Sequence, residues 1–155
     1  MIKKLLSIIF VGLLLSGSAN ATMKGIFEME LMVENLNKYA KECSVTKQKI
    51  ETAVKYILQN SKIKIKEHPY NAVLYVKVGV IKAGDVCTAN LDISVFSYFG
   101  KDPLELENSG TFVFYRNSHM TSGGTISSFA NSVVSGIEGL MKELVVKHHE
   151  DNLKE

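Results

Sequence analysis

Cysteine is scarce in this sequence, with only Cys43 and Cys87 among 155 residues. The two cysteines are not part of a C-x-x-C pair, and no histidine lies at a spacing that would complete a metal site with them. This pattern argues against a cysteine-bound metal centre. We expect no metal ion and no other cofactor.

The sequence also lacks the motifs that carry common enzyme chemistry. It has no G-x-S-x-G motif, and residues 122–124 (SGG) lack the lysine and the spacing of a phosphate-binding loop, so we interpret them as a hinge. Asp92 and His119 could meet across neighbouring strands, but no nucleophile is marked between them. We interpret three carboxylates of one predicted strand as an ordinary outward face: Glu28, Glu30 and Glu34. The sequence therefore predicts a protein that is not an enzyme.

Histidine and methionine are the other residues that could bind a transition metal. His119-Met120 and His148-His149 are the candidates, with Met29 and Met32 as soft ligands. Adjacent residues on a helix point about 100° apart, so two neighbouring histidines do not readily share one ion. We interpret the histidine pair as solvated residues near a helix C-terminus, where positive charge suits the helix dipole.

Apolar runs of membrane-spanning length are absent as well. A spanning helix needs about 20 apolar residues, whereas residues 5–15 are shorter and already include Ser7 and Gly12. Two lysines precede this stretch, and the small-residue tripeptide Ala-Asn-Ala follows it. This order is typical of a secretory signal peptide. We expect residues 1–21 to be removed by cleavage between Ala21 and Thr22.

The mature chain, residues 22–155, has no excess of charge of either sign. Loss of the two signal lysines reduces 18 basic residues to 16, which equals the number of acidic residues. No basic stripe remains that would bind nucleic acid or anionic lipid. Thr22 follows the cleavage point where a lipoprotein would need a cysteine. We expect one periplasmic or secreted domain, with no membrane span after removal of the signal.

An even number of cysteines in an exported protein favours a disulfide between Cys43 and Cys87. This bond would close a loop of about 44 residues and contribute about 3–4 kcal/mol to stability. Two separate buried thiols are the alternative. The topology raises a concern: the two cysteines would begin at opposite ends of the sheet if the first strand and the strand after the first helix were parallel neighbours.

Hydrophobic periodicity predicts the secondary structure of the mature chain. Alternating apolar residues predict strands, and apolar residues three and four positions apart predict helices. Thr46 is expected to cap the first long helix, with Val45 packing on Ile50. The last helix is expected to end near His148-His149, before a charged tail, residues 150–155, that frays. The predicted strands cover residues 27–34, 62–67, 72–82, 86–99 and 111–120, and the predicted helices cover residues 46–60 and 125–149.

The order of these elements predicts an α+β fold. We expect one mostly antiparallel sheet of about five strands, with two helices packed on one face. About three strands from residue 62 onward are expected to form a meander, with a turn at residues 68–71 and a tight hairpin at residues 83–85, and a further strand follows them. Residues 100–110 are expected to form a polar loop.

The last predicted helix has a ridge of small residues beside its apolar stripe. Glycine inside a helix costs about 1 kcal/mol relative to alanine, so two glycines there suggest close approach by another backbone. Tight packing within the monomer is the first interpretation, and a docking groove for a partner or a second copy is the other. The ridge consists of Ser128, Ser132, Ser135, Gly136 and Gly139.

The segment from Leu58 to Val95 resembles a known family. A helix ends in "LQNSKIKI", and "LYVKVGVIKAGD" and "ANLDISVFS" follow as a hairpin. This pattern is similar to the N-terminal α/β domain of the Tol-Pal translocation protein, and more loosely to domains of curli and exopolysaccharide export machines. It covers about a third of the chain, and no propeller domain follows. The resemblance implies a non-enzymatic envelope domain that docks partners.

These observations lead to three hypotheses about function. The first is a non-enzymatic exported, periplasmic domain that binds a partner protein or an envelope component, or associates with itself. The second is a periplasmic protein that binds a small ligand or a metal. The third is a small secreted hydrolase.

Overall fold

The computed structural model describes residues 22–67, 72–99, 110–123 and 125–153. The predicted signal peptide, the turn at residues 68–71 and most of the polar loop lie outside the described residues. The elements that follow are β1 (Glu28–Val33), α2 (Lys38–Glu42), α3 (Lys47–Leu58), β2 (Lys64–Ile65), β3 (Val73–Ala83), β4 (Val86–Phe99), β5 (Gly110–Ser122) and α4 (Ile126–Leu153).

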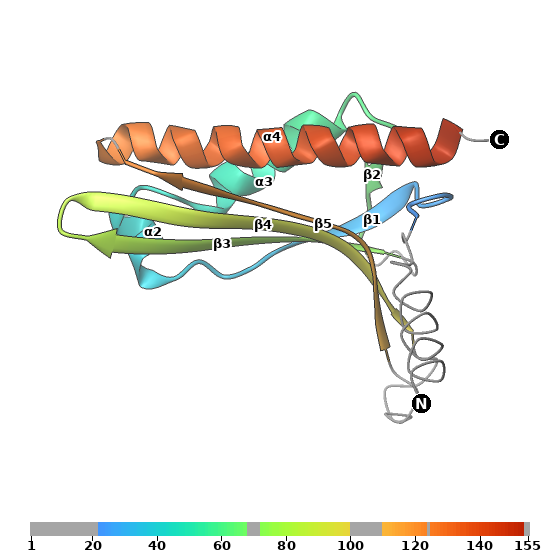
Figure 1. Ribbon diagram of the computed structural model, residues 1–155, viewed down its shortest axis with the longest axis horizontal. Coiled ribbons are helices and arrows are strands. Elements are labelled where there is room, and N and C mark those ends of the chain that lie inside the picture. The colour runs from blue at the N-terminus through green and yellow to red at the C-terminus, as the bar shows by residue number, and fades with distance from the viewer. Residues whose placement is uncertain (1–21, 68–71, 100–109, 124, 154–155) are drawn as a thin grey trace, which may run out of the picture.

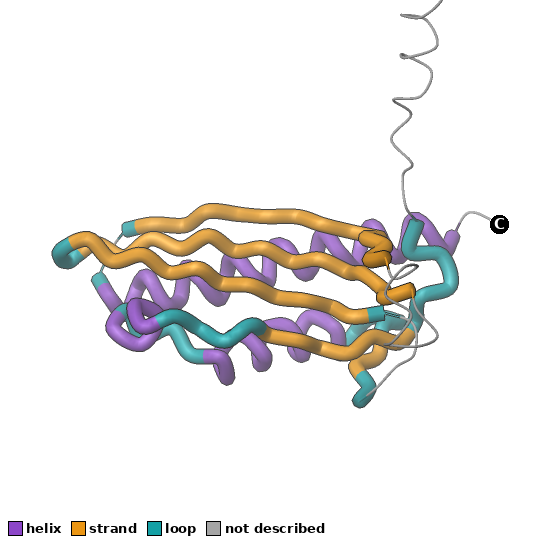
Figure 2. Tube along the Cα trace, turned by 90° about the horizontal axis from the view of Figure 1, so that it is seen from below, coloured by secondary structure: helices purple, strands orange, loops and turns teal. Residues whose placement is uncertain are grey.

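The expected α+β architecture is confirmed. The strands form one five-stranded sheet in the order β2-β1-β3-β4-β5. Most of its paired residues are antiparallel, because the long strands β3, β4 and β5 pair as a meander. Figures 1 and 2 show α3 and α4 on one face of this sheet, with the strands in front of both helices when the molecule is seen from below. The short helix α2 is a third helix and lies outside the two helices that the sequence predicts.

One part of the predicted topology is wrong. The strands β2 and β3 are not antiparallel neighbours, because β1 lies between them and is parallel to both. The chain leaves β1, crosses through α3 and returns beside β1 in the same direction, which is the usual result of a helical crossover. Only β3, β4 and β5 therefore form the expected meander.

The core lies between the sheet and the two long helices. The alternation in β4 places Cys87, Ala89, Leu91, Ile93 and Val95 on the covered face, where all of them are buried. The same side holds Leu74, Val76, Val78 and Val80 of β3. The helix α4 packs onto β4 and β5. The opposite face of the sheet has no helix over it in the described part of the chain (Figure 2).

The caps expected from the sequence explain where α3 begins. The Thr46 hydroxyl accepts a hydrogen bond from the Lys49 N–H at 3.3 Å, as an N-cap does. Val45 and Ile50 are both buried at this end of the helix. Local sequence therefore determines the start of α3.

The expected disulfide between Cys43 and Cys87 is present, with the two Cα atoms 6.3 Å apart. The expected obstacle does not arise, because β1 is parallel to β3 and a hairpin joins β3 to β4. The end of β1 and the start of β4 consequently lie at the same end of the sheet. Asn37 holds α2 at this end by donating a hydrogen bond to the Val80 carbonyl at 2.6 Å.

The helix α4 runs further than expected. It continues past His148-His149 to Leu153, so that residues 150–153 form its last turn. The side chains of Asp151 and Asn152 bind the backbone of residues 23 and 25, at the other end of the described chain. These long-range hydrogen bonds give the charged residues of this turn a tertiary role.

Candidate functional site

The edge strand β5 turns polar side chains toward the helices. In its register with β4, Asn117 lies opposite Ile93 and His119 lies opposite Leu91. Ile93 and Leu91 are fully buried on the covered face, so Asn117 and His119 point to the same side of the sheet. Polar residues at these positions interrupt the core at the edge of the sheet.

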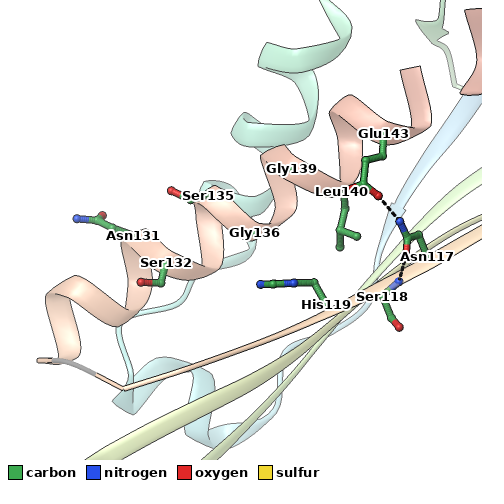
Figure 3. A pocket seen from close by; sticks show the side chains of 10 residues that line it. All are labelled: Asn117, Ser118, His119, Asn131, Ser132, Ser135, Gly136, Gly139, Leu140 and Glu143. Atoms are coloured by element: carbon green, nitrogen blue, oxygen red, sulfur yellow. Dashed lines mark hydrogen bonds between the residues drawn. The ribbon is translucent and has the colours of Figure 1, made fainter. Parts of the chain in front are cut away.

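A groove of about 580 Å³ lies between β5 and α4. Figure 3 shows the His119 side chain projecting from β5 toward α4, where Ser132 and Gly136 lie. The walls of this groove consist of polar and small residues and one leucine. The lining residues are Asn117, Ser118, His119, Asn131, Ser132, Ser135, Gly136, Gly139, Leu140 and Glu143.

The two glycines of α4 play different parts in this groove. A methyl group added at Gly136 would lie 2.5 Å from Cδ1 of Leu91 and 3.4 Å from Cδ2 of His119. At Gly136, α4 therefore packs closely on the sheet. A methyl group added at Gly139 would meet no atom within 4 Å, so Gly139 contributes open space to the groove.

A hydrogen-bond chain closes one end of the groove. The Asn117 amide donates to the Glu143 carboxylate of α4 (Figure 3). It also donates to the Tyr115 hydroxyl oxygen at 3.3 Å. Burial raises the pKa of Tyr115, the hydrogen bond from Asn117 lowers it, and the nearby Glu143 charge raises it further; the net pKa lies above its ordinary value. Tyr115 therefore stays neutral at physiological pH.

Among the described residues of the groove, no hydrogen bond joins a serine hydroxyl, the His119 ring and a carboxylate. The Ser132 hydroxyl donates to the Ser128 carbonyl at 3.1 Å, and within the described residues no carboxylate orients the His119 ring. Asp92 and His119 do not meet, because Asp92 lies opposite Ser118 and points to the other face of the sheet. There Asp92 accepts from Arg116 at 2.8 Å. Asp92 is only 9% exposed.

The candidate metal ligands are not brought together. Met29 is buried in the core, whereas Met32 and Met120 are exposed. His119 lines the groove, and His148 binds the Ile26 carbonyl at the far end of α4. The described residues contain no group of three or more His, Cys, Asp or Glu side chains placed to hold an ion.

The carboxylates of the first predicted strand do not gather into a site either. Glu28 pairs with Lys66 at 2.5 Å, and Glu34 lies 3.4 Å from Lys77. All four side chains are partly exposed. These contacts are surface ion pairs, which contribute little to stability.

Most of the small-residue ridge lines the groove. Ser132, Ser135, Gly136 and Gly139 do so, whereas Ser128 is tied to the start of α4 by hydrogen bonds with Thr125. The sequence did not identify the β5 wall or Glu143. The polar residues at alternate positions of β5 were the available signal, but their side could be assigned only after the register with β4 was known.

None of the helices that the structure describes combines the length and the apolar character needed to cross a bilayer.

The comparisons with known proteins found no matching protein-family model, and no curated protein is significantly similar to the chain. A crystal structure of a minor lipoprotein from Acinetobacter baumannii is similar to it, with 11% sequence identity and a TM-score of 0.41. The match covers 79% of this chain and 90% of the lipoprotein. This likeness is too distant to assign a family or a function, and the resemblance to the Tol-Pal translocation protein stays a prediction from the sequence.

Proposed function

We propose that the mature chain is an exported, non-enzymatic domain that binds an extended segment of a partner protein along β5. The observation that carries the proposal is the groove of about 580 Å³ directly beneath the edge strand. β5 is the last strand of the sheet and has 13 residues. In the described part of the chain, no strand pairs with its outer edge.

An unpaired edge can accept another strand. Its backbone N–H and C=O groups form a ready template, and a peptide that adds to such an edge gains affinity from main-chain hydrogen bonds. Natural proteins often protect edges with lysine or proline, and β5 contains neither residue. Its one basic residue, Arg116, has a side chain that is 71% exposed but is engaged by Asp92.

The groove explains how such a strand would be selected. Side chains alternate along a strand, so every second residue of an added segment would point toward α4. The open space at Gly139 and the short side chains of Ser132 and Ser135 leave room for these residues. Asn117, Asn131 and His119 offer hydrogen bonds, so the groove suits polar side chains.

A small polar ligand is the second candidate. The volume of the groove lies within the range of about 300–1,000 Å³ that is typical of ligand pockets. Its amide, hydroxyl and carboxylate groups would recognise such a ligand by hydrogen bonds. A ligand of this kind would bind without new protection of the β5 backbone.

The test uses variants of α4 and amide hydrogen exchange. Gly139→Leu should fill the groove and abolish capture of envelope proteins, while the melting temperature stays near that of the wild type. Lys142→Leu, at an exposed position of α4 that does not line the groove, is the matched control. The captured partner should slow exchange of the β5 amides.

Two results would contradict the proposal. Capture of the same proteins by Gly139→Leu would exclude the groove, and exchange unchanged in β5 would exclude strand addition. Export is tested separately: N-terminal sequencing of the exported protein should begin at Thr22.

A further inference from the structure

The first described residues are attached to the last turn of α4. The Met23 N–H donates to Oδ2 of Asp151 at 2.9 Å, and the Gly25 N–H donates to Oδ1 of Asn152 at 2.8 Å. Asn152 also donates to the Met23 carbonyl at 3.3 Å. These contacts connect positions almost 130 residues apart, with sequence separations of 127 to 129. The two ends of the mature domain therefore meet.

Asp151 is the most heavily engaged residue of this contact. Its side chain is only 8% exposed, and it pairs with Lys147 one turn earlier in α4. The Thr22 side chain is among the groups that lower the pKa of this carboxylate. Burial raises the pKa of Asp151. The hydrogen bonds from Lys147, Met23 and Thr22 together lower this pKa by more, so the net pKa lies below its ordinary value. Asp151 is therefore a carboxylate at neutral pH.

We propose that Asp151 and Asn152 form the binding site for the mature N-terminus, with the Asp151 carboxylate pairing with the α-ammonium group of Thr22. This inference rests on the processing step of the proposed function, cleavage between Ala21 and Thr22. Before cleavage the Thr22 nitrogen is a neutral amide. After cleavage it is an amine with an ordinary pKa of about 7.7–8.0, mostly protonated at neutral pH.

Covalent geometry places the new charge close to the carboxylate. Successive backbone nitrogens are no more than about 3.6 Å apart, so the Thr22 nitrogen lies within about 6.5 Å of Oδ2. Opposite charges at about 4–6 Å favour each other's charged forms. The bond from the Met23 N–H keeps the neighbouring Thr22 close to Asp151. Lys147 engages Oδ1, whereas the Met23 N–H engages Oδ2 on the side of the N-terminus.

The consequence is that processing completes the fold. Among the described residues, the contacts of the last turn of α4 with the N-terminal segment are to the neutral backbone of residues 23 and 25. In the mature chain this turn also holds a cation. The mature domain is therefore more stable than the same domain with residues of the signal attached.

The test compares purified chains with defined starts. One chain begins at Thr22 and the other at Ser18, which moves the ammonium group four residues away. The chain that begins at Thr22 should melt about 2–4 °C higher. Asp151→Asn should lower both melting temperatures and remove the difference between the starts. Glu150→Gln, at an exposed neighbouring position, should preserve the difference.

Equal melting temperatures for the two starts would overturn the inference. So would a difference between them that persists in Asp151→Asn. If Asp151→Asn does not fold, acetylation of the Thr22 amine in the wild-type chain decides: the melting temperature should fall to that of the longer chain, and an unchanged value would refute the ion pair. These measurements need no partner and no processing in the cell, so their failure is distinct from failure of the proposed function.

Discussion

At the scale of single residues, His148 differs most from what its sequence context suggests. The expectation of a solvated histidine is wrong, because His148 is 3% exposed and its Nε2 lies 2.6 Å from the Ile26 carbonyl. A carbonyl oxygen only accepts, so Nε2 carries the proton. The ring also packs edge-on against Phe27, with centroids 5.4 Å apart. His148 is buried because the segment before β1 packs against it. The helical pattern of α4 alone does not show this contact.

The buried state of His148 predicts a loss of stability in mild acid. Burial lowers its pKa most; the Ile26 carbonyl and Asp151 oppose this shift, while His149 and Lys62 add to it, and the net pKa lies below its ordinary value. The unfolded chain therefore takes up the proton first. The contribution of neutral His148 to the free energy of unfolding should be fully present above about pH 6.5. It should decrease as the pH falls from there toward the pKa of His148 in the folded protein.

Urea unfolding at pH 7.5, 6.5 and 5.5 measures this dependence. His148→Gln should be less stable than the wild type at pH 7.5 but should lose less stability on acidification. His149→Gln, at an exposed neighbouring position, should keep the slope of the wild type. A wild-type slope in His148→Gln would show that another group causes the acid sensitivity.

At the scale of elements, the packing of α4 on the sheet explains the glycines of its small ridge. The helix crosses β4 and β5 at Gly136, where a side chain would collide with the fully buried Leu91. The packing interpretation of the ridge is thus correct for Gly136. Gly139 lies one turn further along the helix, and nothing occupies the space beside it. Docking at that position stays a proposal.

Alanine substitutions at the two glycines should separate these roles. Both remove a glycine from a helix interior and gain about 1 kcal/mol of helix propensity. Gly136→Ala must also displace Leu91, and overpacking of a core typically costs about 1–3 kcal/mol. Gly136→Ala should therefore be less stable than Gly139→Ala by about 1–3 kcal/mol, measured by urea unfolding. Equal stabilities would mean that Leu91 moves aside at no cost.

At the scale of the whole molecule, the disulfide joins the residue that caps the end of α2 to the start of β4. It links residues 44 positions apart, across the hairpin end of the sheet. Both cysteines belong to the buried core, with Cys43 fully buried. The bond therefore connects the first half of the chain to the long meander.

Removal of this bond should destabilise the domain. The double variant Cys43→Ala/Cys87→Ala should lose about 3–4 kcal/mol of unfolding free energy, because the unfolded chain regains the freedom of the closed loop. Non-reducing mass spectrometry should find the mature chain two hydrogens lighter than its reduced form. Complete labelling of both thiols in native, air-exposed protein would contradict the bond.

The sequence by itself determined the local features. Alternating residues showed which side of β4 is apolar, and Thr46 with Val45 and Ile50 showed where α3 begins. These predictions hold because periodicity and capping depend on residues close together in the chain. The same patterns were enough to predict the α+β class with five strands.

Only the tertiary structure decided which elements are neighbours. The insertion of β1 between β2 and β3 put Cys43 and Cys87 at the same end of the sheet. The register of β5 turned Asn117 and His119 toward α4 and so created the groove. A periodic pattern states which side of an element is apolar but not which element covers it, because that choice depends on contacts between residues far apart in the chain.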